Sequence, residues 1–296
     1  MTEISVIVPS VGESPALYEC LRALRGQKCN FAYEIIVVDR TGKIDSEYFS
    51  AQFSQVKLIN LSRAHGIPEM RAVGITESVG KFVAIIEDHC LAPENWLSEI
   101  LSAHESGCEV IGGAVENASP KRIIDWAVFL CEYSSFMPPI ADGETAFITG
   151  NNTSYKRELL EKLDESLLRN YWEYFLQAEL RNRGVKFFSV SGLVINHKKE
   201  FGFFYFLSQR FNYSRSFAAM RKRNSPLKKQ IGYLFYLPLL PFHQVWRISR
   251  NIFRKKRNYR EFFLSLPLIV VFMCSYALGE LVGQIFGEGD SLLKVE

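Results

Sequence analysis

Residues 82–89 read Phe-Val-Ala-Ile-Ile-Glu-Asp-His, so five apolar residues are followed at once by two carboxylates and an imidazole. An apolar run of this length, preceded by Gly80, is typical of a buried strand in a parallel sheet. Similar β-branched runs occupy residues 4–8 and 34–38. We therefore expect these segments to form the centre of a sheet, with the polar residues 87–89 at the carboxyl end of one strand.

Helix-length segments separate these strands. Ser14 and Pro15 form an N-cap and first-position pair ahead of three leucines spaced for one apolar helix face, and residues 68–78 form a second such segment. This alternation predicts a doubly wound α/β sheet, whose ligands bind at the carboxyl ends of the strands. A loop around 135–145 is long enough to act as a flap. Further elements are expected at 93–103 (helix), 109–114 (strand), 123–133, 156–163 and 172–183 (helices), 185–190 and 193–195 (strands).

The C-terminal third has a different composition. Residues 201–260 contain 14 basic and no acidic residues, although the whole chain has a formal net charge of only +3. The cations are interleaved with aromatic residues and leucines, and a long apolar run follows. This pattern favours an anionic membrane surface, and not nucleic acid, as the partner, because the usual nucleic-acid-binding modules are absent.

Two apolar stretches in this third are candidates for membrane contact. Residues 262–286 are just long enough for a spanning helix of about 20 residues, although Pro267 and Glu280 count against a span. Residues 231–246 are interrupted by prolines and suit an interfacial or re-entrant helix. The chain opens directly on a strand, without a basic leader, so we expect the catalytic part to stay on the cytoplasmic face of a membrane, held peripherally or by a single span.

Four polar positions are candidates for chemistry, each with a structural alternative. Asp39 ends a strand and could bind a nucleotide, or could simply be a turn residue. The residues 87–89 could hold a divalent cation, or form a solvated loop. His197 follows a strand-like run and is either a second imidazole ligand or a structural histidine. Glu173, beside Trp172, is either a general base or a favourable first-turn acid.

Taken together, these segments resemble the family-2 glycosyltransferases over roughly residues 3–200. Residues 4–10 resemble the opening strand and its turn, and residues 34–39 resemble the strand whose terminal Asp holds the nucleotide base. Arg40 stands where the family has a second Asp, which puts the ribose contact in doubt. The resemblance implies a GT-A fold, a Rossmann-like mixed sheet, followed here by a helical membrane-associated segment.

The same resemblance implies a metal site. Residues 80–89 resemble the strand that leads into the family's DxD motif, with Glu87 and His89 in place of the two aspartates. In related transferases with a DxH variant a later histidine completes the coordination, and His197 matches that position. Mn²⁺ or Mg²⁺ is therefore expected on Glu87, His89 and His197.

The resemblance also implies a catalytic base. Residues 149–152 resemble the loop near the donor sugar, and residues 163–165 resemble the family's FDE turn. Glu173, eleven residues before Gly184, stands in place of the Asp of the Glu-Asp motif, which makes it the base of an inverting transferase. The residues implied in donor binding are Pro9, Ser10, Glu13, Asp39, Arg71, Asp88, Gly150 and Asn151.

The implied function is metal-dependent, inverting transfer of a sugar, from a UDP-sugar by preference, to a hydroxyl of a lipid-linked or other membrane-borne glycan. Residues 1–200 would form the catalytic domain and residues 201–296 the membrane-associating region. The alternative is a membrane-anchored nucleotide-sugar-binding scaffold without turnover, kept open by four departures from the family pattern, at Arg40, Glu87, His89 and Trp172. A dinucleotide-dependent oxidoreductase is disfavoured, because no G-x-G-x-x-G follows the first strand.

Overall fold

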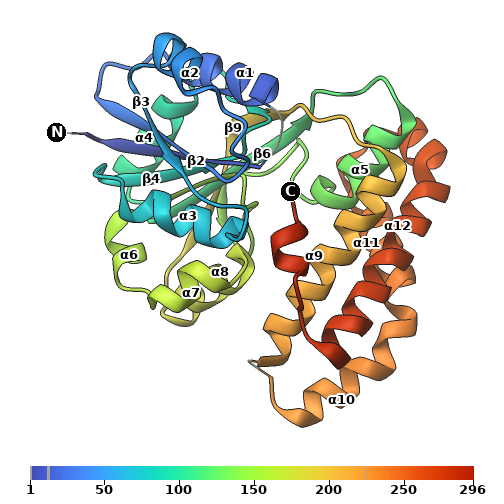
Figure 1. The fold of residues 1–296 in the computed structure, drawn as a ribbon. Coiled ribbons are helices and arrows are strands. Elements are labelled where there is room, and N and C mark those ends of the chain that lie inside the picture. The colour runs from blue at the N-terminus through green and yellow to red at the C-terminus, as the bar shows by residue number, and fades with distance from the viewer. Residues whose placement is uncertain (1, 12–13, 224) are drawn as a thin grey trace. The chain divides into compact units, whose positions relative to one another are not determined.

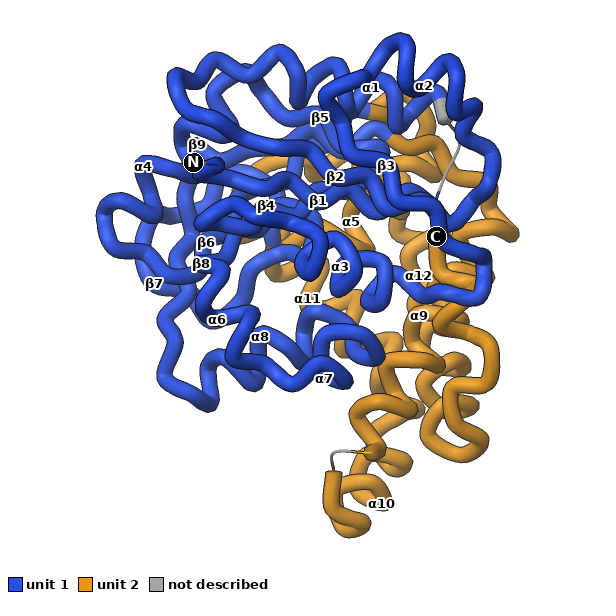
Figure 2. The backbone as a smooth tube through the Cα atoms, turned by 60° about the vertical axis from the view of Figure 1, so that its left-hand side comes forward, with its two compact units in different colours: residues 1–118, 136–198 blue, residues 119–135, 199–296 orange. Residues whose placement is uncertain are grey.

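The computed structural model describes residues 2–11, 14–223 and 225–296. Glu13, which the resemblance assigns to the donor site, lies outside this described part. The described residues fall into two compact units, coloured separately in Figure 2. Unit 1 comprises residues 1–118 and 136–198, and unit 2 comprises residues 119–135 and 199–296. The segment 119–135, which we had expected within the catalytic region, therefore belongs with the C-terminal third.

Unit 1 is built on one mixed sheet of nine strands in the order β3-β2-β1-β4-β8-β6-β9-β5, with β7 beside β9. Strands β1 to β4 are parallel, and β8 runs antiparallel between β4 and β6, which makes the sheet mixed. The apolar runs predicted as strands at 4–8, 34–38 and 82–86 lie in β1, β2 and β4. The strands are β1 (Ile4–Ser10), β2 (Tyr33–Asp39), β3 (Val56–Asn60), β4 (Phe82–Ile86), β5 (Cys90–Leu91), β6 (Val110–Asn117), β7 (Gly143–Thr145), β8 (Asn152–Lys156) and β9 (Phe187–His197).

Helices lie on both sides of this sheet, with α1, α2 and α4 on one side and α3, α6, α7 and α8 on the other (Figure 1). They are α1 (Ser14–Arg25), α2 (Ser46–Gln52), α3 (Ile67–Thr76), α4 (Trp96–Glu105), α6 (Arg157–Glu161), α7 (Glu165–Asn170) and α8 (Glu173–Asn182). The three leucines that predict α1 are fully buried: Leu17, Leu21 and Leu24. Sheet and helices together give the expected mixed α/β architecture, with helices on both sides of the sheet.

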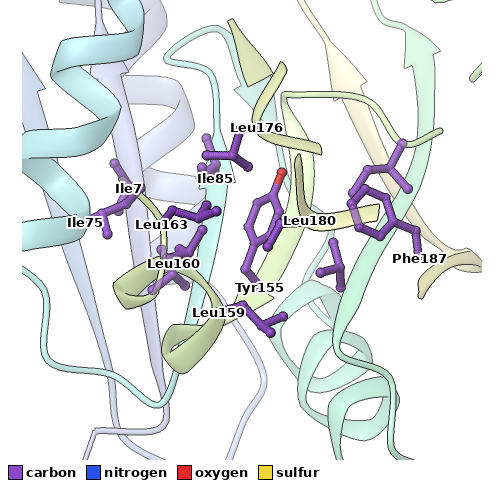
Figure 3. Packing of buried hydrophobic residues seen from close by; sticks show 13 residues of the cluster. Ile7, Ile75, Ile85, Tyr155, Leu159, Leu160, Leu163, Leu176, Leu180 and Phe187 are labelled. Atoms are coloured by element: carbon purple, nitrogen blue, oxygen red, sulfur yellow. The ribbon is translucent and has the colours of Figure 1, made fainter. Parts of the chain in front are cut away.

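The core on the side of α3 and α8 fixes the elements that carry the site. Ile7 from β1, Tyr155 from β8 and Leu180 from α8 belong to one buried cluster, which Figure 3 shows from close by. Burying a large apolar side chain of this kind contributes roughly 1.5–3 kcal/mol. Leu176 and Leu180 anchor α8 in this cluster. Since Glu173 begins α8, its position is set by the same packing.

Local structure differs from the sequence expectations at several points of unit 1. We expected a helix over residues 156–163 and assigned no element to 152–155, but residues 152–156 form the strand β8 and α6 begins at Arg157. This polar strand has no apolar periodicity; it is held by a neighbouring strand on each side and by its own side chains, such as Thr153 Oγ1, which donates to the Ile111 carbonyl at 3.0 Å. The two strands expected at 185–190 and 193–195 are the single strand β9.

The expected flap around 135–145 is also partly ordered by pairing. Its end forms β7, which pairs antiparallel with β9. Asp142 accepts hydrogen bonds from the backbone N–H of Ser191 at 2.5 Å and from its hydroxyl at 2.9 Å. This part of the segment is therefore tied to the edge of the sheet.

Unit 2 is helical. Its elements are α5 (Ile123–Tyr133), α9 (Phe203–Arg223), α10 (Leu227–Tyr236), the 3₁₀ turn η1 (Leu237–Leu239), α11 (Leu240–Lys255), α12 (Tyr259–Phe286) and the 3₁₀ turn η2 (Ser291–Lys294). The interfacial helix expected at 231–246 is thus divided between α10 and α11 at η1. α12 packs against α9, α5 and α11. Among the described residues it is the one helix long and apolar enough to cross a membrane, judged by length and composition.

Candidate active site

The polar residues that follow the parallel strands meet at one edge of the sheet. β1 and β2 are in register up to the pair Ser10 and Asp39, and β2 and β3 up to Asp39 and Asn60. β4 ends at Ile86, so the residues 87–89 emerge at the same carboxyl edge. This is the edge at which open α/β sheets bind their ligands.

Strand pairing brings His197 to the residues that follow β4. β5 and β9 run antiparallel with Cys90 opposite His197, which places His89 beside it. The two Nε2 atoms lie 2.9 Å apart, and Glu87 Oε2 lies 3.4 Å from His89 Nε2. Ligand atoms of Glu87, His89 and His197 all lie within 4.8 Å of one another. The three residues predicted as metal ligands therefore converge.

Asp88 positions His89. One oxygen of the buried Asp88 carboxylate lies 2.8 Å from His89 Nδ1, and the other accepts the backbone N–H of Val11 at 2.9 Å. A carboxylate that accepts from Nδ1–H leaves the lone pair on Nε2, the nitrogen that faces His197 and Glu87. Asp88 thus orients the histidine and holds the segment after β1, and the direct donor contact that the resemblance implies for it stays a prediction.

Asn151 and Thr149 position Glu87. Asn151 Nδ2 donates to Glu87 Oε2 at 3.1 Å, and the Thr149 hydroxyl donates to Asn151 Oδ1 at 2.6 Å. Burial alone would raise the pKa of the Glu87 carboxyl, but His89, His197 and Arg71 outweigh it and hold this pKa well below its usual range. The Glu87 carboxylate is therefore ionised at neutral pH and held in one orientation.

Arg71 links this cluster to Glu173. Its Nη1 donates to Glu173 Oε2 at 2.6 Å, and its Nη2 lies 3.9 Å from Glu87 Oε1. Burial alone would lower the pKa of the Arg71 guanidinium, but Glu173 and Glu87 raise it. The Arg71 side chain is 9% exposed, and its Nε is buried without a hydrogen-bond partner. The guanidinium is thus held between the two carboxylates.

Gly150 leaves space for the Glu173 carboxylate. A Cβ built on Gly150 would lie 2.6 Å from the carboxyl carbon and from Oε1 of Glu173. Any larger residue at this position would force the carboxylate to move. Glu173 itself begins α8, directly after the buried Trp172, and its side chain is 26% exposed. It is therefore reachable by a substrate while held by Arg71.

The remaining predicted donor residues line the ends of β1 and β2. Pro9 and Ser10 are buried in β1. Asp39 is fully buried, and its two oxygens accept from the Thr41 backbone, the Thr41 hydroxyl and the Gly42 backbone at 2.8–3.2 Å. Asp39 therefore shapes the turn after β2, and the contact to the nucleotide base that the resemblance implies for it stays a prediction. Arg40 is buried, and its Nη1 donates to the His65 carbonyl at 2.9 Å.

The cluster fits a divalent cation. Two ligands that coordinate one cation at about 2.1 Å and at right angles lie about 3 Å apart, close to the 2.9 Å and 3.4 Å separations here. One carboxylate oxygen and two imidazole nitrogens suit Mn²⁺ and similar cations, and they leave coordination positions open for phosphate oxygens. Glu87, His89 and His197 would hold the cation, and Asp88 and Asn151 would orient its ligands.

The sequence named every ligand candidate but missed part of the support around them. Thr149 was placed in the loop 149–152 but given no role of its own, although it holds Asn151 in the orientation that reaches Glu87. The coupling of Arg71 to Glu173 was also missed. The only sequence signal for either was adjacency to a motif residue, because the contacts join segments 64 and 102 residues apart.

Comparisons with known proteins identify the family and the fold of the chain. Residues 5–164 match the family described as Glycosyl transferase family 2. The chain is 28% identical over 123 residues to a protein named Glycosyltransferase AglE from Haloferax volcanii. That match spans about 40% of each of the two chains.

Solved structures with a similar fold cover nearly the whole chain. Residues 1–349 of S. aureus TarS share 16% identity with a TM-score of 0.54, over 95% of this chain and 91% of that chain. The mannosyltransferase PcManGT from Pyrobaculum calidifontis, solved in complex with GDP-Man and Mn²⁺, shares 16% identity with a TM-score of 0.55, over 94% and 87% of the two chains. TarS has also been solved in complex with UDP and with UDP-GlcNAc. At this identity the likeness shows the fold.

Proposed function

Given that this chain belongs to glycosyl transferase family 2, we propose that it transfers a sugar from a nucleotide-sugar donor to a membrane-borne acceptor, with inversion and with a divalent cation. The observation that carries the proposal is the continuous contact from Glu173 through Arg71 to Glu87, His89 and His197. The Arg71 guanidinium thus lies between a candidate base and a candidate cation site, at the ligand-binding edge of the sheet.

The proposed chemistry divides between these two ends of the site. Glu173 accepts the proton of the acceptor hydroxyl as that oxygen bonds to the anomeric carbon and the bond from this carbon to the diphosphate breaks. Such general-base assistance is typically worth about 10²- to 10⁴-fold in rate. A cation held by Glu87, His89 and His197 would supply Lewis-acid neutralisation of the charge on the leaving diphosphate. Arg71 holds the Glu173 carboxylate in place and adds positive charge beside the diphosphate.

We propose UDP as the nucleotide of the donor. The supporting observations are the complexes of TarS with UDP and UDP-GlcNAc, in a fold that covers 95% of this chain. The mannosyltransferase complex contains GDP-Man instead, so GDP is the natural competitor in a test. Pro9, Ser10 and Asp39 shape the ends of β1 and β2 where the base and ribose would lie.

The acceptor is proposed to be lipid-linked or otherwise borne by a membrane, with the protein attached to the cytoplasmic face through unit 2. The support is the apolar helix α12 and the 14 basic residues within 201–260. Anionic headgroups attract such a segment with roughly 1 kcal/mol for each cation near the surface.

Isothermal titration of the full-length protein with UDP and with GDP, each with and without Mn²⁺, tests the donor site. We expect UDP binding that requires Mn²⁺ and that is lost when Glu87→Ala is combined with His89→Ala. The matched control is His65→Ala, because His65 is a histidine of unit 1 that bonds within its own turn, to Ser62. If neither nucleotide binds with any cation, the proposed donor site is contradicted. The alternative of a nucleotide-sugar-binding scaffold is then contradicted as well.

A further inference from the structure

The exposed side of α12 is apolar from Phe263 to the end of the helix. Exposed apolar residues recur every three or four positions, so they lie on one side of the helix. We call this surface the α12 face, and it includes Phe263, Pro267, Val270, Cys274, Leu278 and Ile285. A continuous exposed apolar surface of this length marks an interaction site.

A second helix extends this surface. On α11 the exposed residues Phe242, Trp246 and Phe253 are spaced four and seven positions apart and form a stripe along one side. The ring of Phe253 lies 6.5 Å from that of Phe263 and 5.5 Å from that of Tyr259. The α11 stripe and the α12 face therefore meet at the corner between the two helices.

Cations border this surface. Arg250, Arg254, Lys256 and Arg260 are all exposed, and the Arg250 guanidinium lies 5.5 Å from the centre of the Trp246 ring. No acidic residue occurs in residues 201–260 to balance them. Apolar and aromatic side chains flanked by Arg and Lys are typical of a helix that lies in the interface of an anionic membrane.

The opposite side of α12 is packed too tightly against α9 to be exposed to lipid. A Cβ on Gly279 would lie 2.3 Å from the Phe211 carbonyl oxygen, and one on Gly283 would lie 2.2 Å from that of Arg215. The two glycines, four residues apart, thus allow the helix backbones into direct contact. Glu280, which is 1% exposed, forms a two-bond ion pair with Arg221 of α9.

The chain after α12 also returns along α9. Arg215 Nε donates to the Gly287 carbonyl at 3.0 Å, Gln209 Nε2 donates to the Lys294 carbonyl at 3.1 Å, and the Glu296 backbone N–H donates to Gln209 Oε1 at 2.9 Å. If α12 crossed a bilayer, either these contacts and the Arg221 pair would break, or α9 would carry its arginines into the hydrocarbon. Both are costly.

From these contacts we propose that α12 lies in the plane of an anionic bilayer and does not cross it. The α12 face and the α11 stripe are buried at the boundary between headgroups and acyl chains, and the bordering cations contact anionic headgroups. The inference rests on the membrane attachment proposed above, and it is independent of the donor site in unit 1.

Cys274, near the middle of the α12 face, is exposed and provides a native probe of depth. Three proteins are labelled with a fluorophore, all in a background that carries Cys29→Ser and Cys108→Ser. The first is labelled at Cys274. The other two carry Cys274→Ser and are labelled at Phe263→Cys or at Ile285→Cys. Vesicles of phosphatidylcholine and phosphatidylglycerol carry nitroxide quenchers at shallow or deep acyl positions. We expect one shallow depth for all three labels.

A spanning helix gives a different result. Labels at 263 and 285 would lie about 16 Å on either side of the label at 274, since each is eleven residues away at about 1.5 Å per residue. A deep central label with two shallow ends would overturn the proposal. A soluble dimer in which Cys274 is protected from labelling and which does not bind vesicles would also overturn the proposal, because a second copy of the chain would then cover the α12 face.

The cations are tested on the same vesicles. The double variant Arg250→Gln, Arg254→Gln should bind these vesicles more than tenfold more weakly, because each lost cation weakens binding by about fivefold. The control variant Lys162→Gln, in unit 1, should bind as tightly as the wild type. Unchanged binding by the double variant would contradict the headgroup contact. Titration of the labelled proteins with UDP and Mn²⁺ separates this inference from the proposed donor site. Intact nucleotide binding together with a deep central label would contradict the in-plane position of α12 and leave the donor site unaffected.

Discussion

Arg71 donates a hydrogen bond to Glu173, with Nη1 2.6 Å from Oε2, although the two residues are 102 positions apart in the chain. The other end of the same guanidinium lies 3.9 Å from Glu87. The carboxylate that we propose as the base is therefore held in position by the same group that borders the proposed cation site. Changes near this contact should affect turnover and donor binding separately.

Replacing Glu173 by Gln should lower turnover by about 10²- to 10⁴-fold, because the amide cannot accept the acceptor's proton. Arg71 can still donate to the amide oxygen, so UDP binding should change little. Donor turnover and UDP titration on the same sample measure the two effects. Glu179→Gln, on the exposed part of the same helix, is the control. Full turnover by the Glu173 variant would remove it as the base.

Gly150→Ala should impair turnover without unfolding the protein. The new Cβ would lie 2.6 Å from the Glu173 carboxyl carbon and would displace this flexible group. A displacement of about 1 Å in a catalytic group can cost about 10²-fold in rate. Kinetics and thermal unfolding should be compared with Gly232→Ala, where a Cβ meets nothing within 4 Å. Wild-type kinetics would show that Glu173 is not needed at this position.

Asp88→Asn should weaken Mn²⁺ binding by about 10- to 100-fold, the usual effect of losing a group that orients a ligand. One amide oxygen cannot accept from both Val11 N–H and His89 Nδ1–H, as the carboxylate can. The histidine is then free to place its proton on Nε2, where a ligand lone pair is required. Direct titration with Mn²⁺ measures the change, with the exposed Asp290→Asn as control. Equal affinities would show that Asp88 has no part in orienting His89.

His104 should make unit 1 less stable in mild acid. Burial between α4 and β8 lowers the pKa of His104 from 6.5 to about 4, and nearby Lys156 and Lys81 act in the same direction. The unfolded chain binds a proton below about 6.5, whereas the folded chain does not until about 4. The contribution is therefore complete above the unfolded pKa and is lost as the pH falls towards the folded one.

The expected loss is about 3 kcal/mol in the free energy of unfolding across that pH window. Urea unfolding at several pH values should show a steeper acid dependence in the wild type than in His104→Gln. Parallel pH profiles for the two proteins would mean that the pKa of His104 is the same in the folded and the unfolded chain.

Much of unit 1 was predictable from local patterns. The apolar runs at 4–8, 34–38 and 82–86 predict strands because only strands buried on both faces read as unbroken β-branched segments. The helix signals at Ser14 and Pro15 likewise coincide with α1, and in unit 2 the segment 123–133 coincides with α5. β8 could not be predicted, because its polar side chains satisfy their hydrogen bonds with distant strands.

The sequence by itself determined where the candidate residues lie along the chain: Glu87, Asp88 and His89 follow a buried strand, and Glu173 begins a helix. Tertiary structure alone decided which of them meet. His197 reaches His89 only because β9 pairs with β5, and Arg71 reaches Glu173 only because α3 and α8 pack on the same side of the sheet. It also decided that α12 has one packed and one exposed side. Side-chain identity is local, whereas the distance between residues a hundred positions apart depends on strand pairing and packing.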